Sequence, residues 1–363
     1  MKSRPKIIAL YLPQFHSIPE NDEWWGKGFT DWTNVKKAKP LYAGHAQPRI
    51  PLDNNYYDLS DVENLRWQTS LAEKYGVSGF CFYHYWFAGG KKLLEKPAEL
   101  LLQHTDISLQ FCFSWANEPW ARTWDGKGHK VLMPQEYGDI HDWRDHFDYL
   151  LPFFRDSRYI KVGGKPMFVI YKTRSIPCCQ EMMTEWIRWA KEEGLPGIHF
   201  VETLRDGNID QRPLPIEARM EFEPARTDYQ IPVVQLYYRR IRRRVVALVN
   251  NIFGTSIKHN TNWTFDYISQ RALANLSPEG TYGGAFAGWD NSARRGLAAT
   301  IIEPPTKEQF RSYLSAVMKK TEEVYHTDYV FINAWNEWAE GTYLEPDEMN
   351  KYSYLEVIKE LTE

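Results

Sequence analysis

The 363-residue sequence lacks the patterns that mark metal, dinucleotide and membrane-spanning proteins. It has only four cysteines, Cys81, Cys112, Cys178 and Cys179, without metal-ligand spacing. HExxH is absent, no Gly-rich loop follows a strand-like run, and no apolar run is long enough to cross a bilayer. A formal net charge of −3 argues against bulk nucleic-acid binding. We therefore expect reduced thiols and no metal, cofactor or nucleic-acid partner.

The N-terminal segment has a basic start followed by a short apolar run, Ile7 to Leu12, before Pro13. The apolar core of a signal peptide has roughly 7 to 15 residues, so this run is too short for one. We expect it to form the first strand of a cytoplasmic protein.

Aromatic residues are abundant, with 15 Trp and 22 Tyr. Both types carry a polar group that needs a partner when buried, so a core alone does not call for so many. We expect part of them to pack the core and part to line a cleft, where an aromatic face can stack on a sugar ring or a nucleobase.

Short β-rich apolar runs alternate with helical patterns, which predicts repeated βα units around a parallel sheet. Eight such runs occur: Ile7–Leu12, Gly79–Tyr83, Leu109–Ser114, Pro166–Tyr171, His199–Thr203, Ala218–Phe222, Gly283–Ala287 and Tyr329–Ala334. The expected fold is a (β/α)8 TIM barrel with long βα loops, which is an α/β fold.

Helical patterns lie between most of these strands, over Asp61–Lys74, Lys92–Gln103, His141–Phe154, Gln180–Glu193, Thr264–Ala274, Thr306–Glu323 and Tyr352–Leu361. The link between the fifth and sixth strands, Leu204–Glu217, is too short and Pro-rich for a helix. We expect one catalytic barrel domain over residues 1–363, with insertions at about 17–58 and 227–262; the first would be an ordered cover over the barrel mouth.

Active sites of such barrels lie at the carboxyl ends of the strands, and polar and aromatic residues gather there in this sequence. The residues expected to bind substrate are Tyr11, Gln14, His16, His84, Tyr85, Trp86, Trp115, Asn117, Glu118, Trp120, Glu202, Glu221, Trp289, Asp290, Asn336, Trp338 and Glu345, with Trp32 from the first long loop. Asp290 is expected to face the pocket.

The sequence NEWAE near the C-terminus offers two carboxylates, Glu337 and Glu340. Cleavage of a glycosidic bond usually needs two such groups, and these are the candidate catalytic residues. In an extended strand they would point to opposite faces, so the chain must turn near Trp338, for which Gly341 is suitable. The alternative for any one of these acids is a structural pair with an arginine.

Two other candidates have structural alternatives. Glu118 suits a hydrogen bond to a sugar hydroxyl, or it pairs with Arg122 in a loop. His84 binds a hydroxyl, or it is a hydrogen-bonded core histidine.

The segment YYRRIRRRVVALVNNIF places five arginines, between Arg239 and Arg244, beside an apolar stretch. Such a segment is either a solvated helix face or a peripheral contact with an anionic membrane or a lipid-linked glycan.

Several long motifs together resemble the WbsX-like, glycoside hydrolase family 99-like proteins of bacterial polysaccharide loci. The motifs are YLPQFH (Tyr11 to His16), GFCFYHYWF (Gly79 to Phe87), FSWANEPW (Phe113 to Trp120), GWDNSARRG (Gly288 to Gly296) and NEWAEGTYLEP (Asn336 to Pro346). The resemblance covers nearly the whole chain, although Pro119 stands where the WbsX-like pattern has Asn.

Related family 99 endo-α-mannosidases are (β/α)8 barrels that cleave with retention and without a covalent glycosyl-enzyme. The resemblance implies that Glu337 is the base that activates the substrate's 2-hydroxyl, giving a 1,2-anhydro sugar, and that Glu340 is the general acid and base. The expected substrate is an α-mannoside-like linkage in a bacterial surface polysaccharide such as O-antigen, cut by endo action.

Two alternatives stand beside this interpretation. One is a glycosyltransferase or transglycosylase of O-antigen or capsule assembly, against which we find no evident DxD pair for a metal-bound sugar nucleotide. The other is a non-catalytic carbohydrate-binding protein.

Overall fold

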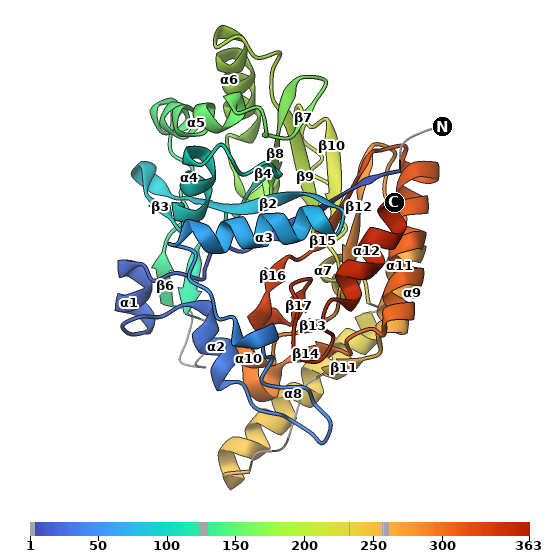
Figure 1. Cartoon of the computed structure of the whole chain (residues 1–363). Coiled ribbons are helices and arrows are strands. Elements are labelled where there is room, and N and C mark those ends of the chain that lie inside the picture. The colour runs from blue at the N-terminus through green and yellow to red at the C-terminus, as the bar shows by residue number, and fades with distance from the viewer. Residues whose placement is uncertain (1–3, 123–129, 232, 256, 258–260) are drawn as a thin grey trace.

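The centre of the molecule is a closed parallel barrel (Figure 1). The computed structural model describes residues 4–122, 130–231, 233–255, 257 and 261–363. The barrel strands, in order around the barrel, are β1 (Lys6–Tyr11), β2 (Val77–Trp86), β4 (Gln110–Trp115), β8 (Lys165–Ile170), β9 (His199–Leu204), β10 (Ala218–Glu221), β12 (Thr281–Phe286) and β15 (Tyr329–Asn333). The predicted (β/α)8 barrel is confirmed.

Strand β1 closes the barrel because it pairs in parallel with both β2 and β15. Ala9 lies opposite Phe80 on one side, and Ile8 lies opposite Phe331 on the other. The strands are almost continuously apolar and buried, as expected for a parallel sheet covered on both faces. All eight predicted strands are present, and the largest difference is that β2 continues to Trp86.

Helices cover the outside of the barrel between most strands (Figure 1). They are α3 (Val62–Lys74), α4 (Lys96–Gln103), α5 (Ile140–Arg155), α6 (Cys179–Glu192), α9 (Phe265–Ala274), α11 (Lys307–Lys320) and α12 (Ser353–Thr362). Helix α4 begins later than predicted because Lys92–Leu93 forms a short strand, β3, against β2. As predicted, residues 205–217 contain no helix.

The two segments predicted as insertions contain helices and strands of their own. The first contains α1 (Pro19–Trp25) and α2 (Asp31–Lys37), and the second contains α8 (Val233–Phe253) and β11 (Thr261–Trp263). Strand β11 joins β14 (Thr300–Ile302) and β13 (Trp289–Asp290) in a small separate sheet. All four cysteines are free, as expected, and no helix among the described residues is long and apolar enough to cross a membrane.

Candidate active site

A cavity of about 630 Å³ lies at the carboxyl ends of the barrel strands. Every barrel strand leads into its lining: Gln14 follows β1, Tyr83 and Tyr85 belong to β2, Glu118 follows β4, Tyr171 follows β8, Arg205 follows β9, Phe222 follows β10, Trp289 follows β12 and Glu337 follows β15. This is the end of the barrel at which the sequence placed the site.

A tight hairpin brings Glu337 and Glu340 into the same cavity. Strands β16 (Asn336–Glu337) and β17 (Thr342–Tyr343) pair antiparallel, and Trp338–Glu340 forms a single 3-10 turn between them. Gly341 has a φ of 60°, and a Cβ at this position would lie 2.7 Å from the Cβ of Asp290. Only glycine fits there without strain. The predicted turn near Trp338 is thus confirmed.

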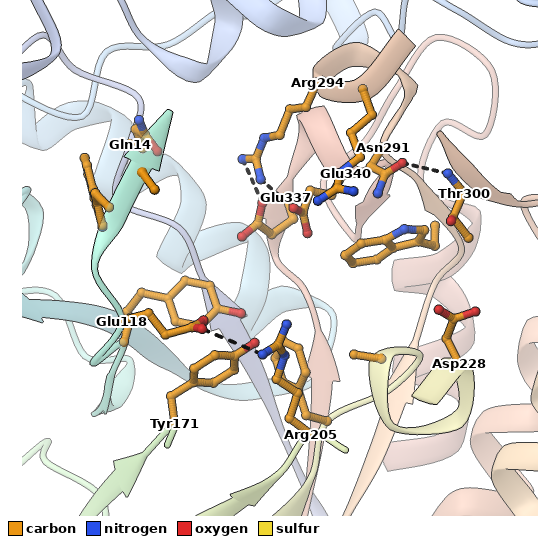
Figure 2. A pocket seen from close by; sticks show the side chains of 18 of the residues that line it. Gln14, Glu118, Tyr171, Arg205, Asp228, Asn291, Arg294, Thr300, Glu337 and Glu340 are labelled. Carbon is orange, nitrogen blue, oxygen red and sulfur yellow. Dashed lines mark hydrogen bonds and ion pairs between the residues drawn. The ribbon is translucent and has the colours of Figure 1, made fainter. Parts of the chain in front are cut away.

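Arg294 lies between the two carboxylates (Figure 2). Its Nη1 donates to Oε1 of Glu340 at 2.6 Å, and its Nη2 lies 3.4 Å from Oε2 of Glu337. The same Nη2 donates to Asp31 at 3.0 Å, and Asp31 is fully buried on α2, where it also accepts from Asn34. The Arg294 guanidinium therefore contacts three carboxylates, and one of them, Asp31, comes from the first insertion and helps to position Arg294.

Burial and charge oppose each other at this cluster. Burial, followed by the charge of Glu340, raises the pKa of Glu337 well above its usual range, while Arg294 acts to lower it. Burial alone would lower the pKa of Arg294, but Asp31, Glu340 and Glu337 together raise it. The net direction for the pKa of Glu337 is upward, so the folded site favours its protonated form in spite of Arg294. A carboxylate with a raised pKa is a stronger base once it is ionised.

The opposite wall of the cavity is cationic and aromatic (Figure 2). Glu118 pairs with Lys172, and its Oε1 lies 3.7 Å from Nη1 of Arg205. The Arg205 guanidinium lies 5.5 Å from the ring centroid of Tyr171 and 5.3 Å from that of Tyr229, which are cation–π distances. Glu118 thus forms a structural pair, although the side chain of Arg122, the partner considered above, lies outside the described residues.

The structure brings part of the predicted site together. The predicted residues that line the cavity are Gln14, Tyr85, Glu118, Trp120, Trp289, Glu337 and Glu340. The remaining predicted residues lie behind the lining or outside it: Tyr11, His16, Trp32, His84, Trp86, Trp115, Asn117, Glu202, Glu221, Asp290, Asn336, Trp338 and Glu345.

Side chains alternate between the two faces of a strand, which explains why several predicted residues lie outside the cavity lining. Because β2 runs to Trp86, Tyr83 and Tyr85 face the cavity while His84 and Trp86 face the helix layer. His84 is a core histidine whose Nε2 lies 2.8 Å from Nε2 of His146 on α5, and burial lowers its pKa to about 3.

Trp86 and two further predicted residues, Trp115 and Tyr11, contact helices outside the barrel. Trp86 stacks on His146, and Trp115 lies edge-on to it; both indoles line a separate cavity of about 160 Å³. At the end of β1, the Tyr11 hydroxyl donates to Gln68 on α3.

Another group of predicted residues supports the hairpin from behind. Trp338 stacks on Tyr343 with ring centroids 3.8 Å apart, and its indole N–H donates to Glu345 at 2.6 Å. Glu345 also accepts from Tyr57 at 2.8 Å and Gln68 at 2.7 Å. Trp32 packs against Trp338, and Asn336 bonds the backbone of Leu12. These residues hold the site and do not line it.

Four further residues are buried, three of them in polar networks. Asp290 was expected to face the pocket, but it accepts from Gln47 and lies 2.8 Å from His45, and it is 1% exposed. Asn117 bonds the backbone of Lys172. Glu202 pairs with Arg219, 3.2 Å away, and borders a neighbouring cavity. His16 is buried.

Glu221 and Glu223 form a buried acidic pair beside Arg226, outside the cavity lining. Glu221 accepts from Arg226 at 2.9 Å and from Tyr325 at 2.7 Å. Burial, followed by the charge of Glu221, raises the pKa of Glu223 to about 7. The folded state therefore keeps a proton that the unfolded state releases near the usual pKa of about 4.3.

We expect Glu223→Gln to stabilise the protein relative to wild type as the pH rises. Because the pKa of Glu223 is raised in the folded state, its protonation adds to the free energy of unfolding of the wild type. This contribution is fully present below about pH 4.3 and is lost as the pH rises through 7. The stability difference between variant and wild type should grow by about 2–3 kcal/mol from pH 5 to pH 8. Urea unfolding at both pH values measures this. An equal difference at the two values would show that Glu223 does not carry this proton.

Several lining residues were not predicted. Tyr171 and Arg205 directly follow barrel strands, so the strand-end rule that found Glu118 also applies to them. Arg294 was visible only as a basic residue after Trp289. Asp31, which lies behind the lining, had no sequence signal, since its place beside Arg294 depends on how α2 packs against the hairpin.

Comparison with known families matches residues 7–358 to the family described as glycosyltransferase WbsX. The chain belongs to the WbsX family. Among curated proteins it is similar to the uncharacterized protein WxcX of two strains of Xanthomonas campestris pv. campestris, with 37% identity over 356 residues. The match covers 98% of this chain and 49% of those proteins, so the chain spans about half the length of its curated relatives.

Among solved structures, this WbsX-family chain is similar in fold to the GH99 endo-alpha-mannosidase from Bacteroides thetaiotaomicron. The TM-score is 0.51 at 13% identity, and the match covers 98% of this chain and 96% of that one. A glycoside hydrolase-like protein matches with a TM-score of 0.57 at 13% identity, covering 100% and 95% of the two chains. Identities this low establish the shared (β/α)8 barrel and not a shared activity.

Proposed function

We propose that the chain is a retaining glycoside hydrolase that cuts α-mannoside-like linkages inside a bacterial surface polysaccharide. The observation that carries the proposal is the pair Glu337 and Glu340, held on one guanidinium in a cavity at the barrel mouth. The aromatic side chains around it, including Trp120 and Trp289, suit the faces of sugar rings. We further propose that residues 1–363 act as one catalytic domain with insertions at about 17–58 and 227–262.

In the proposed reaction, ionised Glu337 takes the proton of the 2-hydroxyl, and O2 attacks C1 to form a 1,2-anhydro sugar. Glu340 protonates the leaving glycosidic oxygen as its bond to C1 breaks. Glu340 then removes a proton from water, which opens the anhydro ring at C1, and Glu337 returns its proton to O2. Two inversions at C1 give net retention, as in other retaining enzymes. The attack requires O2 and the leaving group to be trans, as they are in α-mannosides.

The test is cleavage of α-mannooligosaccharides followed by NMR of the first-formed anomer. We expect an α-configured product, and no cleavage of an analogue that is 2-deoxy at the sugar beside the scissile bond. Initial release of the β-anomer, or cleavage of the 2-deoxy analogue, would rule out 2-hydroxyl participation. Product formation only with an added sugar acceptor would instead identify a transglycosylase, and binding without turnover would identify a carbohydrate-binding protein.

A further inference from the structure

Helix α8 presents an apolar stripe that the described part of the protein does not cover. The stripe follows a spacing of four, three, four, three and four residues, which places its members on one helix face. Its members are each between 44 and 80% exposed: Val234, Tyr238, Ile241, Val245, Leu248 and Ile252. None of the described side chains of α8 is buried. In Figure 1 the helix extends away from the barrel.

A helix in a protein gains most of its stability from packing its apolar face, so a 21-residue helix with this face exposed needs an apolar surface to lie on. Monomeric soluble proteins rarely expose so continuous an apolar patch without a binding role.

The charge of α8 points to the chemistry of that surface. Its sequence contains five arginines and no acidic residue. Arg242 and Arg244 are exposed, while the side chains of Arg239, Arg240 and Arg243 lie outside the described residues. An apolar stripe with clustered arginines and no acid on the same helix is the pattern of helices that lie in the interface of an anionic bilayer.

We propose that α8 binds the surface of anionic membranes, with the stripe inserted among the lipids and the helix axis parallel to the bilayer. The helix does not span the membrane, in agreement with the absence of a membrane-spanning helix from the described residues. Binding combines apolar insertion with attraction between arginine and lipid phosphate, so it should require both anionic lipid and low salt.

The connections of α8 relate this surface to the cavity. Before it, α7 (Ala225–Tyr229) contributes Asp228 and Tyr229 to the lining; after it, β11 pairs with β14, which contributes Thr300 and Ile302. A membrane-bound α8 would thus hold the cavity near glycans carried on lipids. This placement of the substrate rests on the proposed function, whereas membrane binding does not.

Vesicle co-sedimentation of the full chain tests the proposal. We expect binding to vesicles of phosphatidylcholine with one-fifth phosphatidylglycerol, weak binding to pure phosphatidylcholine, and release at 0.5 M NaCl. The double variant I241E/L248E should lose affinity by at least about tenfold, since two apolar contacts are removed. The matched control is Leu276→Glu, which alters a residue that is 68% exposed but lies outside α8, and should bind as wild type. Thermal melting of each variant checks that it is folded.

Three results would overturn the proposal: no sedimentation with anionic vesicles, equal binding to both lipid compositions, or equal loss in the L276E control. A wild-type dimer in light scattering that I241E/L248E converts to monomer, without vesicle binding, would assign the stripe to a second copy of this chain. Hydrolysis of free oligosaccharide is measured separately, so failure of membrane binding is distinguishable from failure of the proposed activity.

Discussion

Glu340→Gln is expected to lower kcat on an unactivated mannooligosaccharide by about 10²–10⁴-fold, the usual contribution of a general acid and base. Its amide keeps the shape and can still accept from Arg294, the partner of Glu340 at 2.6 Å. Substrate affinity should therefore change little. Steady-state kinetics together with calorimetric titration of the inactive variant measure the two quantities.

The leaving group separates the role proposed for Glu340 from that proposed for Glu337. The leaving phenol of an aryl mannoside with an acidic phenol needs little protonation, so the rate of the first step should fall less in Glu340→Gln with this substrate. Glu337→Gln should instead lose activity on the aryl mannoside and on the oligosaccharide by the same factor. Glu118→Gln is the matched control in the same cavity, and we expect it to change KM more than kcat. Equal activity of Glu340→Gln and wild type on the oligosaccharide would refute the assignment.

Glu221→Ala is expected to destabilise the protein by about 3–5 kcal/mol, because it leaves a buried arginine without its close partner. Arg226 is 3% exposed, and among the described residues the other carboxylate beside its guanidinium is that of Glu223, whose Oε1 lies 3.7 Å from Nη1. The substitution also removes acceptors for Tyr325 and Ser277. Urea unfolding at pH 7 gives the free energy of unfolding.

Glu356→Ala provides the matched control for this change. Glu356 pairs with Lys307 on the surface at 2.6 Å, and exposed pairs of this kind contribute about 0–1 kcal/mol. If the two variants lost the same free energy of unfolding, the buried network around Glu221 would contribute no more to stability than an exposed ion pair.

The barrel could be predicted from the sequence because each of its strands has a recognisable local pattern. Each strand is a short apolar run, and parallel strands buried on both faces keep that pattern regardless of their neighbours. The turn at Trp338 could be predicted for a similar reason. Two acids three positions apart on one strand point to opposite faces, and Gly341 follows them at the point where a left-handed residue is required.

The residues that line the cavity were harder to predict because they depend on where each strand ends. Ending the second strand at Tyr83 left His84 to Trp86 in a loop, although three further residues continue the strand and alternate between its faces. Asp290 was assigned to the pocket because it follows a barrel strand, but it sits in β13 and turns toward His45 from the first insertion. Such pairings join residues more than 200 positions apart and leave no local pattern.

The support behind Trp338 has a consequence for how this fold can diverge. Stacking on Tyr343 and the hydrogen bond to Glu345 fix the hairpin from the barrel side, without using any group of the cavity wall formed by Tyr171 and Arg205. The hairpin is therefore held in place by contacts other than those with this wall. Under the proposed function, exchanging the wall segments between members of the WbsX family should alter which glycan fits while the hairpin keeps its geometry, so selectivity could change without rebuilding the hairpin.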